Sequence, residues 1–328
     1  MKKSLLALAA LTAFAGVASA QSSVTLFGIV DLSVNSVKNG AISQKLLSSN
    51  QLNSNRLGFR GIEDLGGGMR AGFWVEGGMN NDEGTGLAAG GGMNWARRST
   101  VSLLGGFGEV RLGRDYTPTF FNKTVFDPFG TNGVGTTQTL NSTLGGPTAV
   151  RASNSVGYFL PGNLGGFYGQ FQYYMGENNQ NGAATEDDGK GNAIRLGYAN
   201  GPVNVAIATS NTSFATTATG GDIKSTNLGG SYNFGEAQAM ALVTRDKVES
   251  APRNRTGKGA LIGALVPMGA GQIRASYSTY KTDAIGTPKS KKIALGYVHN
   301  LSKRTALYTT FARVTNSGGA NSSLNGAV

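Results

Sequence analysis

Residues Phe167–Gly176 read FYGQFQYYMG, and the alternation of apolar and polar side chains in this stretch decides the fold. In an extended strand, successive side chains point to opposite faces of the sheet. One face here is apolar and carries Phe167, Phe171, Tyr173 and Met175; the other carries Tyr168, Gln170, Gln172 and Tyr174. Similar stretches, separated by Gly- and Asn-rich turns, recur from Ser22 to Asn316. A long series of amphipathic strands is typical of an antiparallel β-barrel that spans a membrane.

Fifteen strands can be recognised in this way. They are Val24–Val37, Asn55–Asp64, Met69–Met79, Asn94–Leu104, Glu109–Tyr116, Val150–Leu160, Phe167–Gly176, Asn192–Ala199, Val203–Asn211, Ser225–Phe234, Ala237–Lys247, Gly259–Met268, Gln272–Lys281, Lys291–Asn300 and Arg304–Asn316. Single-chain bacterial barrels have an even number of strands. An odd count implies that a C-terminal strand is missing or that the first and last strands close the barrel irregularly, and the sequence leaves both possibilities open.

The N-terminus has the pattern of a secretory signal peptide, residues 1–20. Lys2 and Lys3 form its charged region, Leu5–Val17 its apolar region and Ala18–Ala20 a cleavage site of the A-x-A type. The apolar run is shorter than the ~20 residues that a transmembrane helix needs. We therefore expect an exported protein whose residues 21–328 form one barrel.

Composition and charge exclude other classes. The 51 glycines and the hydrophobic content of 39% fit a barrel, in which only one face of each strand is apolar. Without Lys2 and Lys3 the net charge is +9, from 29 − 2 basic and 18 acidic side chains. These basic residues are spread over many strands and form no recognisable nucleic-acid module. We therefore expect no nucleic-acid partner.

An enzyme is not expected either. The chain has no cysteine and one histidine, His299, at the end of a predicted strand. A nucleophile–base pair or a zinc site is hard to assemble from such residues. Neither a phosphate-binding loop nor a metal or cofactor site can be recognised.

If the apolar face of each strand meets lipid, the alternation assigns the lumen. Leu57 and Phe59 then face outward, and Arg56 and Arg60 face inward. The same argument predicts inward positions for Glu76, Arg111, Arg151, Arg195 and Arg274. Arg97 and Arg98 are adjacent, and Arg97 shares its parity with apolar residues, so the alternation does not decide which of the two faces the lumen.

These segments resemble the Gram-negative general porins of the β-proteobacterial type, such as those of Burkholderia and Neisseria. The matching stretches are SSVTLFGIVDLSV, NRLGFRGIEDLGGGMRAGFWVEGG, TVSLLGGFGEVRLGR, NSVGYFLPGNLGGFYGQFQYY and KKIALGYVHNLSKRTALYTTFARV. The resemblance covers nearly the whole mature chain and implies a 16-stranded, trimeric barrel. Family members end in one more strand with a terminal aromatic residue, whereas this sequence ends in Val328.

The resemblance also implies a pore constriction. Arg56, Arg97 and Arg151 correspond to the basic cluster on the barrel wall, and it favours Arg97 as the lumenal member of its pair. Residues 117–149 correspond to the third extracellular loop, which bends into the barrel and narrows it. Asp127 of this loop would face the arginines, with Glu76 as a second acidic residue. One alternative is that each arginine only pairs with a carboxylate or lies in an extracellular loop. Another is that residues 117–149 form a surface loop in which Asp127 only caps the Asp-Pro turn.

The sequence thus predicts a passive channel in the bacterial outer membrane, in contact with lipid, for small hydrophilic solutes and anions. Arginine keeps its charge at any relevant pH, so a cluster of arginines favours anions over cations. One alternative is a plugged barrel acting as an adhesin or structural protein, for which the polar inner face is unsuited. Another is a substrate-specific porin, which needs a ladder of aromatic side chains or paired charges that the sequence does not reveal.

Overall fold

The chain folds into one large antiparallel sheet in which neighbouring strands follow the order of the sequence. The structure, a computed structural model, describes residues 23–141, 144, 146–215, 221–249 and 253–324, so the predicted signal peptide lies outside the described residues. The sheet has 16 strands, of which the two-residue β6 pairs only with β5. This architecture confirms the all-β, antiparallel fold predicted from the sequence.

The strands of the main sheet are β1 (Ser23–Ile29), β4 (Arg56–Gly66), β5 (Met69–Asn80), β6 (Thr85–Gly86), β7 (Arg98–Gly105), β8 (Gly108–Tyr116), β9 (Arg151–Phe159), β10 (Phe167–Tyr174), β11 (Gly191–Asn200), β12 (Val203–Thr212), β13 (Ile223–Asn233), β14 (Gln238–Val248), β15 (Arg255–Met268), β16 (Gly271–Thr282), β17 (Lys289–Asn300) and β18 (Ala306–Ser317). Strands β2 (Leu32–Asn39) and β3 (Ile42–Ser49) form a separate hairpin. The helices are η1 (Ala89–Gly91), α2 (Pro118–Val125) and α3 (Gln138–Asn141). None of the helices in the described ranges is long and apolar enough to cross a membrane.

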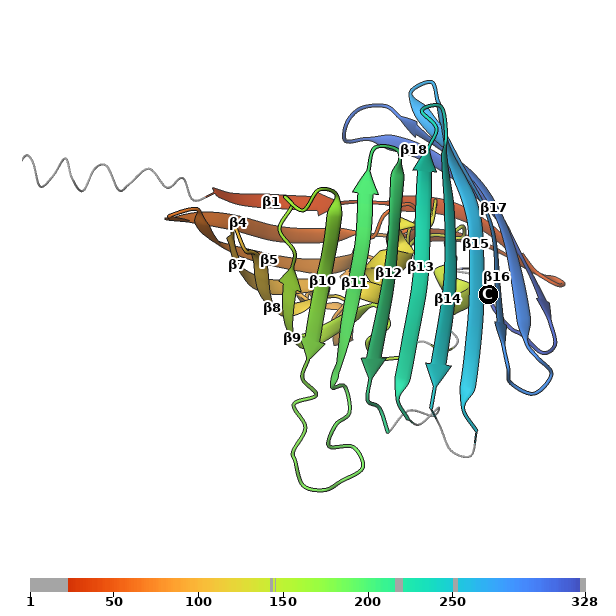
Figure 1. The fold of residues 1–328 in the computed structure, drawn as a ribbon. Helices are drawn as coiled ribbons and strands as arrows, with labels where there is room; N and C mark the ends of the chain where they lie inside the picture. The colour runs from red at the N-terminus through yellow and green to blue at the C-terminus, as the bar shows by residue number, and fades with distance from the viewer. Residues whose placement is uncertain (1–22, 142–143, 145, 216–220, 250–252, 325–328) are drawn as a thin grey trace, which may run out of the picture.

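The sheet curls so that its two halves cross. In Figure 1, strands β1 to β8 (red to yellow) run across the view, whereas β10 to β18 (green to blue) run upright in front of them. Strands on opposite walls of a barrel cross in this way because each is tilted against the barrel axis. Yellow helical turns lie behind β12 and β13, and α2 contacts β11, β12 and β13.

The side chains are arranged inside out relative to a water-soluble protein. On β10, Phe167 and Phe171 are exposed, whereas Gln172 on the other face is buried. The same holds on other strands: exposed Leu228 is next to fully buried Asn227 on β13. Apolar side chains therefore cover the outside of the sheet, which faces lipid in a membrane, and polar side chains line its inside.

The first predicted strand is wrong in one respect, because the structure divides Val24–Val37 into β1 and β2. The chain turns at Asp31, whose backbone N–H donates to the side chain of Asn55 and whose carboxylate accepts from the backbone N–H groups of Leu52 and Asn53. These bonds fix the turn at Asp31, and β2 beyond it pairs only with β3. Most of the other predicted strands agree with the observed ones to within about four residues at each end.

Within the described residues, β1 and β18 form the two edges of the sheet: β1 pairs with β4 and β18 with β17. The hydroxyl of Tyr308 on β18 donates to the carboxylate of Asp31, which follows β1. The two edges are therefore linked by a side-chain hydrogen bond.

The segment after β8 folds onto the inner wall instead of running over the surface. Asn122 of α2 is fully buried and donates to the carbonyl of Ala206 (3.1 Å) and to the side chain of Asn227 (2.7 Å). Asn227 in turn donates to the carbonyl of Thr119 (3.1 Å). Phe126, which follows α2, is also fully buried and packs against Leu242 and other wall residues. Polar and apolar contacts thus fix α2 to β12, β13 and β14.

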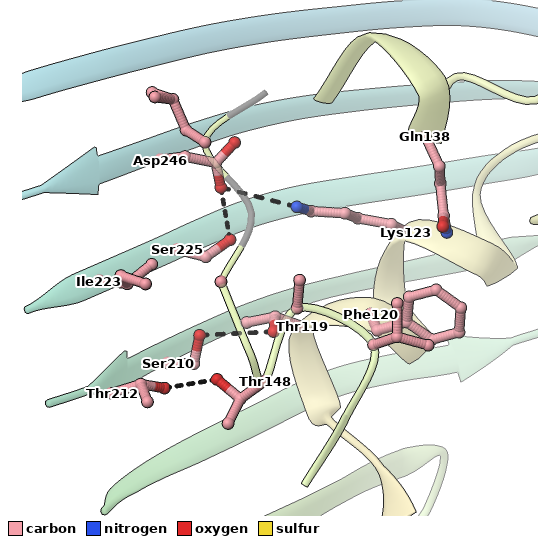
Figure 2. Close-up of a pocket in the computed structure, with 14 residues that line it drawn as sticks. Thr119, Phe120, Lys123, Gln138, Thr148, Ser210, Thr212, Ile223, Ser225 and Asp246 are labelled. Atoms are coloured by element: carbon pink, nitrogen blue, oxygen red, sulfur yellow. Dashed lines mark hydrogen bonds and ion pairs between the residues drawn. The ribbon is translucent and has the colours of Figure 1, made fainter. Parts of the chain in front are cut away.

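Further polar contacts fasten the rest of this segment. Figure 2 shows Lys123 of α2 next to Asp246 of β14, with the ammonium nitrogen 3.6 Å from the carboxylate, and Thr148 bonded to Thr212 at 2.6 Å. A cavity of about 90 Å³ remains between the segment and the wall here. Beyond it, buried Lys292 of β17 donates from Nζ to the carbonyl of Thr136 at 2.6 Å.

Three glycines on alternate strands provide the space for the middle of this segment. A Cβ atom on Gly229 of β13 would lie 2.1 Å from the ring of Phe126, and one on Gly263 of β15 would lie 2.5 Å from Pro128. On Gly296 of β17 it would lie 3.1 Å from the ring of Phe129. We call Gly229, Gly263 and Gly296 the glycine track. The segment can lie this close to the wall only because these residues have no side chain.

We predict that Gly229→Ala destabilises the folded protein by about 1–3 kcal/mol, because the new methyl group overlaps the buried ring of Phe126. Gly230→Ala is the matched control, since its Cβ would point to the other face, with the nearest atom 3.7 Å away. Urea unfolding of the two refolded variants measures the difference. Equal midpoints for both variants would show that the ring does not rest on Gly229.

Asp127 belongs to the internal structure of this segment. The residue is 5% exposed, and its carboxylate accepts hydrogen bonds from the backbone N–H groups of Phe129 (2.9 Å) and Thr137 (2.8 Å). Burial raises the pKa of Asp127 from 3.8 to about 6, although both hydrogen bonds and nearby Lys292 favour the ionised form. The folded state therefore binds the proton more tightly than the unfolded chain does.

Because of this shift, the free energy of unfolding depends on pH. Protonated Asp127 stabilises the fold fully below about pH 4, and this contribution is lost as the pH rises through about 6. We predict that the free energy of unfolding falls by up to about 3 kcal/mol over this interval relative to that of Asp127→Asn, which has no titrating group at this position. Urea unfolding at a series of pH values measures the difference, and parallel curves for the two proteins would contradict the prediction.

Candidate functional site

Three arginines that are far apart in the sequence meet on the inner wall. Arg56 begins β4, Arg97 directly precedes β7 and Arg151 begins β9. We call them the arginine cluster. Between them lie Glu76 of β5 and Tyr116 at the end of β8, so neighbouring strands supply all five side chains.

Glu76 is the acidic partner of this cluster. Its Oε1 atom lies 2.6 Å from Nε of Arg97 and 3.3 Å from Nη1 of Arg56. The indole N–H of Trp74 donates to the other oxygen at 3.1 Å. Glu76 is buried, as the alternation predicted for a side chain on the inner face of β5.

Tyr116 holds the other side of the cluster. Its hydroxyl accepts hydrogen bonds from Nη2 of Arg97 and Nη2 of Arg151, both at 2.9 Å. The guanidinium carbon of Arg151 lies 4.4 Å from the centre of the Tyr116 ring, and Nε of Arg151 donates to the carbonyl of Arg97 at 2.7 Å. The Tyr116 ring also stacks on Phe120 of α2, with the ring centres 5.1 Å apart. The arginines are therefore fixed to each other and to the inner segment.

The cluster carries a net positive charge. Three guanidinium groups and one carboxylate give +2. Among the described residues, Arg151 forms no ion pair with a carboxylate; its polar partners are a hydroxyl and a carbonyl. A fixed positive charge on a low-dielectric wall attracts anions and repels cations more strongly than the same charge in bulk water.

The alternation left open whether Arg97 or Arg98 faces the inside. In the structure both lie on the inner face. Arg98 is the first residue of β7 and donates to Thr100, which has the same parity and is buried inside. Arg97 precedes the strand, where the backbone does not follow the alternation. The period-two rule applies only within a strand, so it could not assign Arg97.

Arg98 and Arg111 form a second group with acidic residues of β8. Nε of Arg98 lies 3.7 Å from Asp115, and Arg111 contacts the same carboxylate at 2.5 Å. Arg111 also pairs with Glu109 at 2.8 Å, and its guanidinium lies 3.9 Å from the centre of the Phe159 ring. Arg111 therefore pairs with two carboxylates. Of the three arginines in the cluster, Arg56 and Arg97 also pair with a carboxylate, that of Glu76, and Arg151 does not pair with one among the described residues.

The remaining predicted lining residues lie elsewhere on the wall. Arg195 of β11 donates to Asn122 (2.7 Å) and to the hydroxyl of Tyr168 (3.2 Å). Arg60 of β4 lies over the Trp74 ring at 5.0 Å, next to the arginine cluster. Arg274 of β16 lies on the far part of the sheet, where it interacts electrostatically with Asp127.

Asp127 is not brought to the arginine cluster. Both of its oxygens accept hydrogen bonds from the backbone of its own segment, and the charged residues around it are Lys292 and Arg274. This differs from the expectation that Asp127 faces the arginines, and it fits the alternative of a cap on the Asp-Pro turn. The sequence reasoning overlooked Tyr116, which ends a predicted strand and has the parity of outward-facing Leu112; a register shift between Gly113 and Asp115 interrupts the alternation before it. It also overlooked buried Lys292.

Comparisons with known proteins give the family. The sequence model of the Gram-negative porins matches residues 7–319. Outer membrane porin protein 32 of Delftia acidovorans is 42% identical over 329 residues, which cover 96% of this chain and 90% of that protein. An outer membrane porin protein of Bordetella pertussis is 30% identical over 364 residues, covering 94% and 93%.

A solved structure agrees with these matches. The anion-selective porin from Comamonas acidovorans superimposes with a TM-score of 0.83 at 39% sequence identity, over 90% of each chain. The resemblance noted in the sequence is thereby confirmed along almost the whole chain. The chain belongs to the Gram-negative porin family of outer-membrane β-barrel proteins.

Proposed function

We propose that this protein is a general diffusion channel that lets small hydrophilic solutes cross the outer membrane and prefers anions. The observation that carries the proposal is the arginine cluster, whose net charge of +2 lies on the polar inner face of the sheet. The name of the Comamonas acidovorans porin, an anion-selective channel, supports the same preference. Members of this family are passive channels and not enzymes.

The narrowest part of the channel is proposed to lie between the arginine cluster and residues 117–149. The stacking of Phe120 on Tyr116 brings α2 next to the cluster, and the contacts of Asn122, Phe126 and Lys292 hold the rest of the segment against the opposite part of the wall. Solutes then pass guanidinium groups that are already oriented. Glu76 keeps these guanidinium groups in place by ion pairing, and Tyr116 does so by hydrogen bonding.

Neutralising the cluster tests the proposal. The triple variant Arg56→Gln/Arg97→Gln/Arg151→Gln is expected to lose most of the anion preference, because Glu76 is left as the charged group of the site. The measurement is the zero-current potential in a planar bilayer under a KCl gradient. For the unchanged protein, the preference should also weaken at 1 M salt, where the screening length falls to ~3 Å.

The control removes the same charge from exposed positions. Lys45→Gln/Lys303→Gln/Arg304→Gln changes one residue of the β2–β3 hairpin and two of the β17–β18 turn, all of them exposed. This variant should keep the anion preference. If both triple variants have the same potential, the preference comes from the total charge of the protein and not from the arginine cluster.

The protein is further proposed to form homotrimers through the outer face of β1, β4, β5 and β7. This face has a hollow of about 330 Å³ lined by the small residues Gly61 and Ala71, and exposed Val24, Phe73 and Val101 surround it. Small residues beneath an apolar rim allow close approach of another apolar surface in lipid, where helices and strands associate by packing. The resemblance to trimeric porins points to a second and a third copy as the partners.

We predict that Val101→Glu dissociates the trimer, because it places a charge in this apolar contact. Val243→Glu is the matched control, since Val243 is an exposed valine on the outer face of β14. Light scattering of the detergent-solubilised proteins measures the mass. A monomeric unchanged protein, or a trimer that survives in the Val101 variant, would contradict the proposal.

A further inference from the structure

A pocket of about 400 Å³ lies beside the arginine cluster, between α2 and the wall formed by β7 to β11. It combines basic and aromatic side chains: Arg98, Arg111, Arg195, Tyr116, Phe121, Phe159 and Tyr168. Its volume falls in the range of about 300–1,000 Å³ that is usual for small-molecule sites. The alternation of the strands does not reveal this pocket, because α2 supplies one side of it.

The positive charge of the pocket is concentrated on Arg195. Arg98 and Arg111 share the carboxylate of Asp115, whereas the hydrogen-bond partners of Arg195 are the uncharged side chains Asn122 and Tyr168. Arg195 is only 6% exposed, and its Nη1 atom makes no hydrogen bond within the described part of the chain. A buried guanidinium without a counter-charge is a strong site for a carboxylate.

The aromatic side chains of the pocket present an apolar surface next to this charge. Phe121 of α2 is 39% exposed although α2 lies on the inner face of the sheet, where water and not lipid surrounds it. One contact of its ring is with the guanidinium of Arg195, 5.0 Å from the ring centre, and Phe159 lies across the pocket. Exposed aromatic surface in water is unfavourable by about 25 cal/mol per Å² and is stabilised when an apolar group covers it.

We propose that this pocket binds small aromatic carboxylates on their way through the channel. The carboxylate contacts Arg195 and Arg98, and the ring packs against Phe121 and Phe159. The inference rests on the proposed channel function and gives it a favoured class of solute. It places aromatic and charged side chains together at one site, whereas a substrate-specific porin needs a ladder of aromatic side chains or paired charges.

The test compares anions that share a charge but differ in the ring. Chloride conductance is first recorded in a planar bilayer in KCl, and then benzoate, acetate or uncharged benzamide is added. Benzoate should reduce the chloride current with a dissociation constant about two- to twelvefold lower than that of acetate, the range that one aromatic contact provides. Benzamide should have no comparable effect, because it lacks the charge that Arg195 binds.

Variants assign the effect to the pocket. Phe121→Ala should bring the dissociation constant of benzoate close to that of acetate, and Arg195→Gln should weaken the binding of both anions. Phe107→Ala is the control, because Phe107 is similarly exposed (42%, against 39% for Phe121) but lies in the β7–β8 turn outside the pocket. Phe121→Leu, which keeps most of the volume without the ring, replaces the alanine variant if that protein does not refold.

The outcomes separate this inference from the channel function. The inference is overturned if benzoate and acetate have equal dissociation constants, or if the preference for benzoate survives in both Phe121 variants. The proposed channel function stands in either case as long as the protein still conducts KCl. Absence of conductance in KCl would contradict the channel function instead. In that case, titration calorimetry of the refolded protein with benzoate and acetate tests the pocket directly, with the same expected ratio.

Discussion

A chain that crosses lipid in strands must pair its backbone N–H and C=O groups with neighbouring strands, because lipid offers no hydrogen bonds. The long antiparallel ladder from β1 to β18 meets this requirement and fixes the direction of each side chain. Alternate residues face lipid and must be apolar, as Phe171 is, whereas their neighbours face inward. Charged side chains therefore gather on the inside, where they interact with each other. The arginine cluster and Glu76 are a consequence of this arrangement.

Once gathered, the arginines are held rigidly. A free arginine side chain loses about 2 kcal/mol of rotamer entropy when it is ordered. Here Glu76 and the hydroxyl of Tyr116 order the guanidinium groups before any solute arrives. A passing anion therefore meets donors that are already in position and does not have to pay for their ordering. Because Tyr116 also stacks on Phe120, the same residue sets the position of α2 relative to the charges.

The sequence was sufficient for the strands and for the inner face of most of them. Arg56, Glu76, Arg111 and Arg195 lie within regular strands, so their direction follows from the period of two. Arg97 lies just before a strand, and the alternation has no meaning there. Its place in the cluster came from the family resemblance alone. The division of the first strand at Asp31 was not predictable for a similar reason, because its cause is a set of bonds to residues about 20 positions away.

Residues 117–149 show the other limit of the sequence. The family resemblance implied that this segment bends into the barrel, but not which of its side chains face the wall. Asp127 was expected in the lumen, and yet its oxygens bind the backbone N–H groups of Phe129 and Thr137. Lys292 was not singled out from the sequence, and it is a buried anchor for Thr136. Both assignments depend on the path of the segment in space.

The glycine track has a consequence for how such a protein can evolve. Phe126, Pro128 and Phe129 lie directly on Gly229, Gly263 and Gly296, which belong to strands far away in the sequence. A larger residue at a position of the glycine track overlaps the side chain packed on it, so it requires a smaller residue at the facing position of residues 117–149. Substitutions at the two facing positions are therefore expected to occur together. Phe121 is exposed and is not among the neighbours of these three glycines. The residue at this position can therefore change while the contacts between the segment and the glycine track stay constant.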